Sequence, residues 1–256
     1  DRTLAIRWHG GSPVKHLNGA RVWLAAGDTV LGEGRLKRVE PHPKGYAILT
    51  AEVRCADARL RQACPQARRL YGGFAFRAPV WRSGRRLYTK AADDLVGVFA
   101  ILQTARALYR RNAARRPPFI GLLTRAEEVG FVGAIAHLEL GWAESRRRPL
   151  VAVSLEASRT LPGARIGKGP VVRLGDRRTV FSADGMQLLS ELAERVLPQA
   201  HQRRIMDGGA CEATAATAFG IPTVGLTVPL GNYHNQGLEG GMDCPRAQGP
   251  APEFVH

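Results

Sequence analysis

The sequence predicts an α/β protein with a central, mostly parallel or mixed sheet flanked by helices, together with a small β-rich module. Three observations carry this prediction. Short strand-like runs separated by turns fill residues 1–82, helical periodicity begins after residue 90, and apolar strands then alternate with helices. Such alternation is typical of sheets covered on both faces. We therefore divide the chain into a β-rich module, residues 1–82, and an α/β domain, residues 83–256.

Within the β-rich module, strand-like runs are expected at residues 3–8, 20–24 and 46–50. Turn-forming glycine, proline and aspartate residues separate these runs. No segment before residue 90 shows convincing helical spacing.

In the α/β domain, apolar residues from 95 to 108 recur at helical spacing. The same reasoning predicts further elements along the rest of the chain. Helices are expected at 95–108, 132–140, 186–196 and 211–219, and strands at 119–124, 150–155 and 222–228. After residue 234 the chain is rich in glycine and proline, and no closing element is expected.

Composition and charge exclude several classes of protein. With 45% hydrophobic and 23% charged residues, the chain is neither disordered, collagenous nor a coiled coil. It has no apolar run of the roughly 20 residues that a membrane helix needs, and its first residues do not show the basic and then apolar pattern of a signal peptide. The net charge of +15 would suit a polyanionic partner, but the arginines are scattered and have no interleaved aromatic residues. We therefore expect no nucleic-acid or membrane partner.

The four cysteines are spaced without a CxxC pair, at Cys55, Cys64, Cys211 and Cys244. This pattern argues against a zinc finger or a disulfide framework. Reduced thiols and a cytoplasmic location are the expectation.

Four polar clusters fall at ends of the predicted α/β elements. They are Asp93-Asp94 before the long helix, Glu127-Glu128 and Glu156 after predicted strands, and Asn232-Tyr233-His234 after the last strand. Each alone has an ordinary explanation: a helix N-cap, a solvated loop, a surface carboxylate and a structural histidine. If all four meet at one sheet edge, however, the carboxylates would repel one another unless a cation neutralised them. The combination therefore suggests a divalent metal site.

The order of these motifs resembles the co-catalytic metallo-aminopeptidases, most closely the glutamyl and tetrahedral aminopeptidase type, with zinc leucyl aminopeptidases and deacylases as more distant relatives. The resemblance covers about residues 83–240. Its most specific part is Glu127-Glu128-Val129-Gly130-Phe131-Val132-Gly133-Ala134, and it also includes Lys90 to Gly97, Gly208-Gly209 and Pro229 to His234.

The resemblance implies a zinc-peptidase-like fold, homo-oligomers and a role for each site residue. Asp93 would bridge two metal ions, and Asp94 would orient Asp93, often across a cis peptide bond. Glu128 and His234 would hold one metal and Glu156 the other, while Glu127 would be the general base. Zinc is the first choice of metal, with cobalt or manganese as alternatives, because oxygen and imidazole ligands suit all three.

The sequence departs from the family pattern in four places. No His-x-Asp motif occurs, since neither His9 nor His16 matches, so the first part of the metallohydrolase domain is expected to be missing. Glu156 stands where the family usually has Asp. The family's Gly-Gly-Thr-Asp-Ala is altered around Gly209 and Glu212, which we assign to substrate binding. The tail is also expected to lack a final helix.

The function expected from the sequence is metal-dependent hydrolysis of peptide or other amide bonds by an exopeptidase, acting on peptides or acylated amino acids. Whether it is an aminopeptidase, a carboxypeptidase or a deacylase stays open. The alternative is a non-catalytic binding or oligomer-forming protein on a degenerated metallohydrolase fold. The retention of Glu127 beside the metal ligands favours the enzyme.

Overall fold

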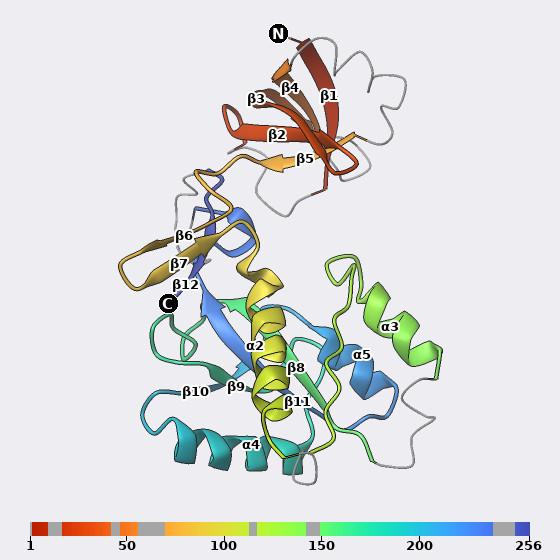
Figure 1. The fold of residues 1–256 in the computed structure, drawn as a ribbon, viewed down its shortest axis with the longest axis vertical. Helices are drawn as coiled ribbons and strands as arrows, with labels where there is room; N and C mark the ends of the chain where they lie inside the picture. The colour runs from red at the N-terminus through yellow and green to blue at the C-terminus, as the bar shows by residue number, and fades with distance from the viewer. Residues whose placement is uncertain are drawn as a thin grey trace. The chain divides into compact units, whose positions relative to one another are not determined.

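The computed structural model describes residues 2–9, 17–41, 47–55, 70–112, 117–141, 149–237 and 249–256 (Figure 1). The chain divides into two compact units. Unit 1 contains residues 1–91 and 232–254, and unit 2 contains residues 92–231 together with Val255 and His256. The division at residue 82 drawn from the sequence stays a prediction.

Unit 1 is built on a five-stranded antiparallel sheet with the strand order β1-β4-β3-β2-β5. Its strands are β1 (Arg2–Trp8), β2 (Arg21–Ala26), β3 (Thr29–Pro41), β4 (Ala47–Cys55) and β5 (Leu70–Phe74). Alternate residues of β2, Val22 and Leu24, are buried and pack with Leu17, Leu36 and Phe74 in a small core. This period of two is what a sheet with one buried face requires.

A second, three-stranded sheet has the strand order β12-β7-β6. It consists of β6 (Val80–Ser83), β7 (Arg86–Thr89) and β12 (Glu253–Val255). The expectation of no closing element was therefore wrong. Phe254 in β12 is buried, its ring lies 5.2 Å from that of Tyr88, and the Arg86 guanidinium lies over it. These contacts of Phe254 stabilise a strand of three residues, which is too short to show a periodic pattern in the sequence.

Unit 2 contains a mixed four-stranded sheet with the order β10-β9-β11-β8. Its strands are β8 (Ala152–Arg159), β9 (Val171–Asp176), β10 (Gln202–Met206) and β11 (Thr223–Leu230). β10 runs parallel to β9 and β11 parallel to β8, whereas β9 and β11 are antiparallel. The predicted α/β class with a mixed sheet is thus confirmed.

Helices α2 (Ala92–Tyr109), α3 (Val132–Glu139), α4 (Ala183–Val196) and α5 (Glu212–Ala218) flank this sheet. α2 packs against β8, α4 against β9 and β11, and α5 against β8, β11 and α3 (Figure 1). All four lie close to the ranges predicted from the sequence. Within the described residues, no helix is both long enough and apolar enough to cross a bilayer.

The strand predicted at 119–124 is absent, and residues 117–124 form an irregular segment. A strand requires a hydrogen-bonded neighbour, and this segment pairs with none of the described strands. Phe119, Ile120, Leu122 and Leu123 are between 41% and 50% exposed. Phe99 and Leu102 of the neighbouring helix α2 are also exposed, as are Val151 and Val153 at β8, which is an edge strand among the described residues.

Candidate metal centre

Two aspartates open helix α2. Asp93 and Asp94 have non-helical backbone angles and are joined by a cis peptide bond, as the sequence resemblance implied. Asp94 Oδ1 accepts a hydrogen bond of 3.1 Å from the Gly97 N–H, which otherwise has no partner in the first helical turn. A Cβ atom at position 97 would collide with the Asp94 carboxylate. Gly97 therefore allows the Asp94 side chain to fold back onto its own helix.

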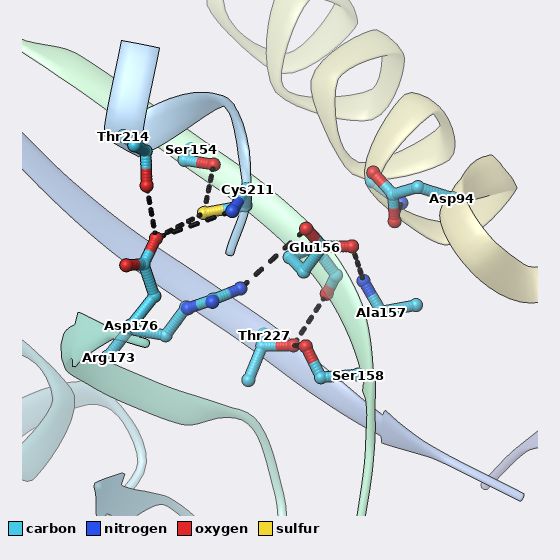
Figure 2. Close-up of polar contacts among 11 residues, drawn as sticks. Asp94, Ser154, Glu156, Ala157, Ser158, Arg173, Asp176, Cys211, Thr214 and Thr227 are labelled. Atoms are coloured by element: carbon cyan, nitrogen blue, oxygen red, sulfur yellow. Dashed lines mark hydrogen bonds and ion pairs between the residues drawn. The ribbon is translucent and has the colours of Figure 1, made fainter. Parts of the chain in front are cut away.

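Glu156 lies within strand β8, not after its end as the sequence analysis expected. The predicted strand stopped too early because β8 continues through polar residues to Arg159. The Glu156 side chain is 11% exposed. Its Oε1 accepts a hydrogen bond of 3.2 Å from the Ala157 N–H, and its Oε2 lies 3.7 Å from Nη1 of Arg173 (Figure 2).

Glu127 and Glu128 lie on the turn that leads into helix α3. The Glu127 carbonyl accepts hydrogen bonds from the N–H groups of Gly130 and Phe131, at 3.0 and 2.9 Å. Gly130 adopts a positive φ of 108°, which glycine tolerates best. The two carboxylates therefore project from a hydrogen-bonded turn, where Glu127 is half-buried and Glu128 exposed.

Glu212 is the first residue of helix α5, and its Oε1 accepts a hydrogen bond of 2.9 Å from the Thr124 hydroxyl. A buried network fixes the start of this helix. Asp176 accepts hydrogen bonds from the Cys211 N–H and the Thr214 hydroxyl (Figure 2). Gly209, the other residue assigned to substrate binding, lies in the preceding loop, where its Cβ position is open.

The carboxylates of unit 2 converge. Oxygens of Asp93, Asp94 and Glu156 lie within 4.8 Å of one another, and so do oxygens of Glu127, Glu156 and Glu212. Asp93 and Glu128 also offer oxygens within 4.8 Å of each other. Glu156 therefore belongs to two overlapping groups, one at the start of α2 and one between the α3 turn and α5.

Burial, with this crowding added to it, raises the pKa of two of the carboxyl groups. Burial raises the pKa of Asp94 to about 8, and the neighbouring charges of Asp93, Glu212 and Glu127 add to the effect. Burial also raises the pKa of Glu156, as do Asp93, Asp94 and Glu127, while Arg173 opposes the rise. Carboxylates that resist ionisation because they are buried and repel one another are what a divalent cation would stabilise. The oxygen donors present therefore fit a divalent metal.

The Cys211 thiol lies beside these carboxylates but is not a nucleophile. Cys211 is fully buried, and the Ser154 hydroxyl donates to its sulfur at 3.5 Å. Burial and the charge of Glu156 raise its pKa to about 12, so the thiol stays neutral. It is a free cysteine, whereas the reduced state expected of the other three cysteines stays a prediction.

His234 belongs to unit 1, in the short 3-10 helix η4 (Tyr233–Asn235). Its backbone is left-handed, with a φ of 55°, and its N–H donates to Glu253 Oε1 at 3.0 Å. The Tyr233 and His234 rings stack with their centroids 3.9 Å apart. Strand β12 thus fixes the His234 backbone through the buried Glu253. Its place in the metal site stays a prediction from the motif.

Sequence reasoning missed three residues of this neighbourhood, Arg173, Asp176 and Glu253. All three are buried charged residues within or at the ends of strands. A charged residue inside a strand pattern normally indicates a solvent-facing position, so the sequence contained no signal for Arg173. Of the two histidines noted in the β-rich module, His9 is exposed and His16 lies outside the described residues.

Comparison with solved structures places this arrangement in a known fold. A TET aminopeptidase from a marine sediment archaeon of the Thaumarchaeota matches with a TM-score of 0.70 and 19% identity, over 96% of this chain and 68% of that one. The Pyrococcus horikoshii TET1 peptidase matches with a TM-score of 0.67 and 20% identity, over 98% and 72%. An M18-family aminopeptidase from Thermotoga maritima matches with a TM-score of 0.56 and 12% identity, over 96% and 70%. At these identities the likeness shows the fold alone.

A search of curated protein sequences gives no match. A family profile described as M42 glutamyl aminopeptidase, however, matches residues 72–238, which is more than half of the chain. This range contains every residue assigned to the site, from Asp93 to His234. The resemblance noted in the sequence is confirmed, and the chain belongs to the M42 glutamyl aminopeptidase family of metallopeptidases.

Proposed function

We propose that this metallopeptidase is an exopeptidase that hydrolyses amide bonds of peptides or acylated amino acids at a centre for two divalent metal ions. The observation that supports it best is that Glu156 lies within 4.8 Å of Asp93 and Asp94 in one group of carboxylates and of Glu127 and Glu212 in another, all in unit 2. Three separate elements supply these side chains: the start of α2, the α3 turn and strand β8.

In this proposal Asp93 would serve both ions, Glu156 would hold one of them, and Glu128 and His234 would hold the other. Asp94, which is anchored to the Gly97 N–H, orients Asp93 through the shared peptide bond. Zinc is the expected metal, with cobalt or manganese as alternatives. When bound, the metal ions would polarise the substrate carbonyl and make water more acidic.

Glu127 is the proposed general base. It is adjacent in sequence to Glu128 and has an oxygen within 4.8 Å of Glu156, so it can face the reacting atoms without being a ligand. It accepts a proton from the attacking water as the new C–O bond forms. It then delivers this proton to the amide nitrogen as the C–N bond breaks, which releases the amine.

Glu212 and Gly209 are the proposed substrate-binding residues. Glu212 Oε1 is already held by Thr124, which fixes the carboxylate near Glu127. Such a carboxylate suits a substrate ammonium group, as an aminopeptidase would require. Glu156 in place of Asp is the feature that instead points towards carboxypeptidase or deacylase chemistry.

The direct test supplies the full chain with Zn²⁺, Co²⁺ or Mn²⁺ and three matched peptides: one with both ends free, one with a blocked amino end and one with a blocked carboxyl end. Mass spectrometry of the products identifies which bond is cut. Loss of cleavage on blocking the amino end alone indicates an aminopeptidase, and loss on blocking the carboxyl end alone a carboxypeptidase. No cleavage of any peptide, together with no metal binding, would refute the proposal.

A homo-oligomer in the cytoplasm is the proposed setting. The Pyrococcus horikoshii TET1 peptidase can assemble into a tetrahedron or a large octahedral shell. A reduced, buried Cys211 suits the cytoplasm. Light scattering after size-exclusion chromatography should give a mass that is a multiple of the 27.8 kDa chain.

A further inference from the structure

Arg173 in strand β9 is the largest fully buried side chain of the described residues, and it is 2% exposed. A buried guanidinium is costly unless it is well paired. Here its Nε and Nη1 atoms have no hydrogen-bond partner. Among the described residues, its one ion pair is the 3.7 Å contact of Nη1 with Glu156 Oε2. An ion pair with so few hydrogen bonds contributes little to folding stability, because an apolar pair of similar volume often stabilises a protein equally well.

The sheet is shaped to let Arg173 reach Glu156. Arg173 lies opposite Gly225 of β11, and Gly225 in turn lies opposite Ser154 of β8. Glu156 is two residues beyond Ser154 and so faces the same side of the sheet. The arginine therefore extends across the middle strand to reach a carboxylate two strands away (Figure 2).

Gly225 leaves that path open. A Cβ atom at position 225 would lie 3.1 Å from Arg173 Cδ and 3.2 Å from its Cβ. It would also lie 2.8 Å from a ring atom of the buried Phe181, which blocks any simple retreat. A Cβ atom there would force the Phe181 ring to move and would press on the aliphatic part of Arg173, so a larger residue at 225 crowds the path of the arginine.

The two carboxylate oxygens of Glu156 have different neighbours. Oε2 faces Arg173, and Oε1 accepts a hydrogen bond from the Ala157 N–H. An oxygen that accepts one N–H keeps a lone pair for a metal. An oxygen held against a buried cation is a much poorer ligand, since a metal there would face the arginine charge directly.

We propose that Arg173 is a positioning residue that restricts Glu156 to one-oxygen ligation of its metal ion. Glutamate has the reach to ligate through both oxygens, as it does in many cation sites. With Oε2 reserved by Arg173, a coordination position stays open for substrate, which catalytic metal sites require. This inference rests on the proposed function, because it takes Glu156 to be a ligand.

The test uses visible absorption of the full chain loaded with Co²⁺, since cobalt bands weaken as the number of ligand atoms rises. Arg173→Met should free the second oxygen and clearly lower the band intensity. Gly225→Ala, which crowds the aliphatic part of Arg173, should shift the band intensity in the same direction. Arg173→Lys, which keeps the charge, should restore the wild-type spectrum. Arg204→Met is the matched control, because Arg204 lies on the far strand β10 and pairs with the exposed Asp207.

The outcomes separate this inference from the proposed function. If Glu156→Gln leaves both cobalt stoichiometry and spectrum unchanged, the proposed metal site is wrong. If Glu156→Gln changes them but Arg173→Met does not, only the positioning role is overturned. A folded Arg173→Met protein that loses stability but keeps the wild-type spectrum would mean that Arg173 is structural. Should Arg173→Met not fold, Arg173→Gln takes its place, and an unchanged spectrum in that folded variant overturns the inference.

Discussion

Asp176→Asn is expected to lower the free energy of unfolding by about 2–4 kcal/mol. The Asp176 carboxylate is 6% exposed and joins two segments that are distant in sequence. Oδ1 accepts the N–H groups of Arg178 and Thr179 at 2.8 and 2.9 Å, which closes the turn after β9. Oδ2 accepts the Thr214 hydroxyl at 2.8 Å and the Cys211 N–H at 3.3 Å, which fixes the start of α5.

The magnitude follows from what asparagine cannot accept. Asparagine keeps one oxygen for the turn but places an amino group where Oδ2 was. The Thr214 hydroxyl can reverse its role and accept from that amino group, whereas the Cys211 N–H would face another donor. Because Cys211 is fully buried, no water replaces the lost acceptor. A buried, unpaired N–H costs about 1–3 kcal/mol, and loss of the charge weakens the remaining bonds by about 1 kcal/mol more.

Urea unfolding followed by circular dichroism measures this change, and Asp207→Asn is the control. The Asp207 side chain is 63% exposed and pairs with Arg204 at 3.2 Å, so its loss should cost less than about 1 kcal/mol. Peptide-resolved thiol labelling adds a local measurement, since freeing the start of α5 should expose Cys211. Equal losses in the two variants, with no faster labelling, would show that Asp176 does not hold α5.

Three further predictions concern the candidate metal centre. Glu127→Gln should lower the rate of amide hydrolysis roughly 10²- to 10⁴-fold and leave the metal content, measured by mass spectrometry, unchanged. Glu128→Gln should instead lower the metal content. Equal metal loss in both variants would mean that Glu127 is a ligand. Folding raises the pKa of Asp94 from 3.8 to about 8, so its neutral form stabilises the metal-free protein at low pH. For chelator-treated protein, the urea concentration at the unfolding midpoint should therefore decrease as the pH is raised from about 4 to about 8. Added Zn²⁺ should remove this decrease. A midpoint that does not change with pH would contradict the shift. Gly97→Ala should lower both thermal stability and metal content because its Cβ collides with Asp94, whereas Gly209→Ala should leave stability unchanged because its Cβ meets nothing within 4 Å.

Helices were predicted more accurately than strands. The apolar spacing of α2 and α4 is a local property, so their ranges could be predicted to within a few residues. The run at 119–124 has the composition of a buried strand but no partner among the described strands, and pairing is not a local property. β12 was missed for the opposite reason, because three residues become a strand only through β7.

In the candidate site, too, residues in local sequence patterns could be predicted, whereas a residue that depends on strand pairing could not. Asp93, Glu127 and Glu156 stand out in the sequence because polar residues interrupt apolar patterns there. Arg173 does not stand out, since its role depends on a glycine in another strand. A residue that acts by reaching across a sheet can be recognised only when the strand order is known.

The exposed apolar residues of unit 2 have a consequence for how the protein behaves in concentrated solution. Phe99 is 63% exposed, Ile120 50% and Val153 54%, and Val153 lies on an edge strand of the described sheet. Such edges are templates for pairing between molecules. The net charge of +15 opposes this association by mutual repulsion. Repulsion is screened over about 10 Å at 0.1 M salt and about 3 Å at 1 M, so colloidal stability should decline as ionic strength rises, and low-salt buffers should favour dispersed protein.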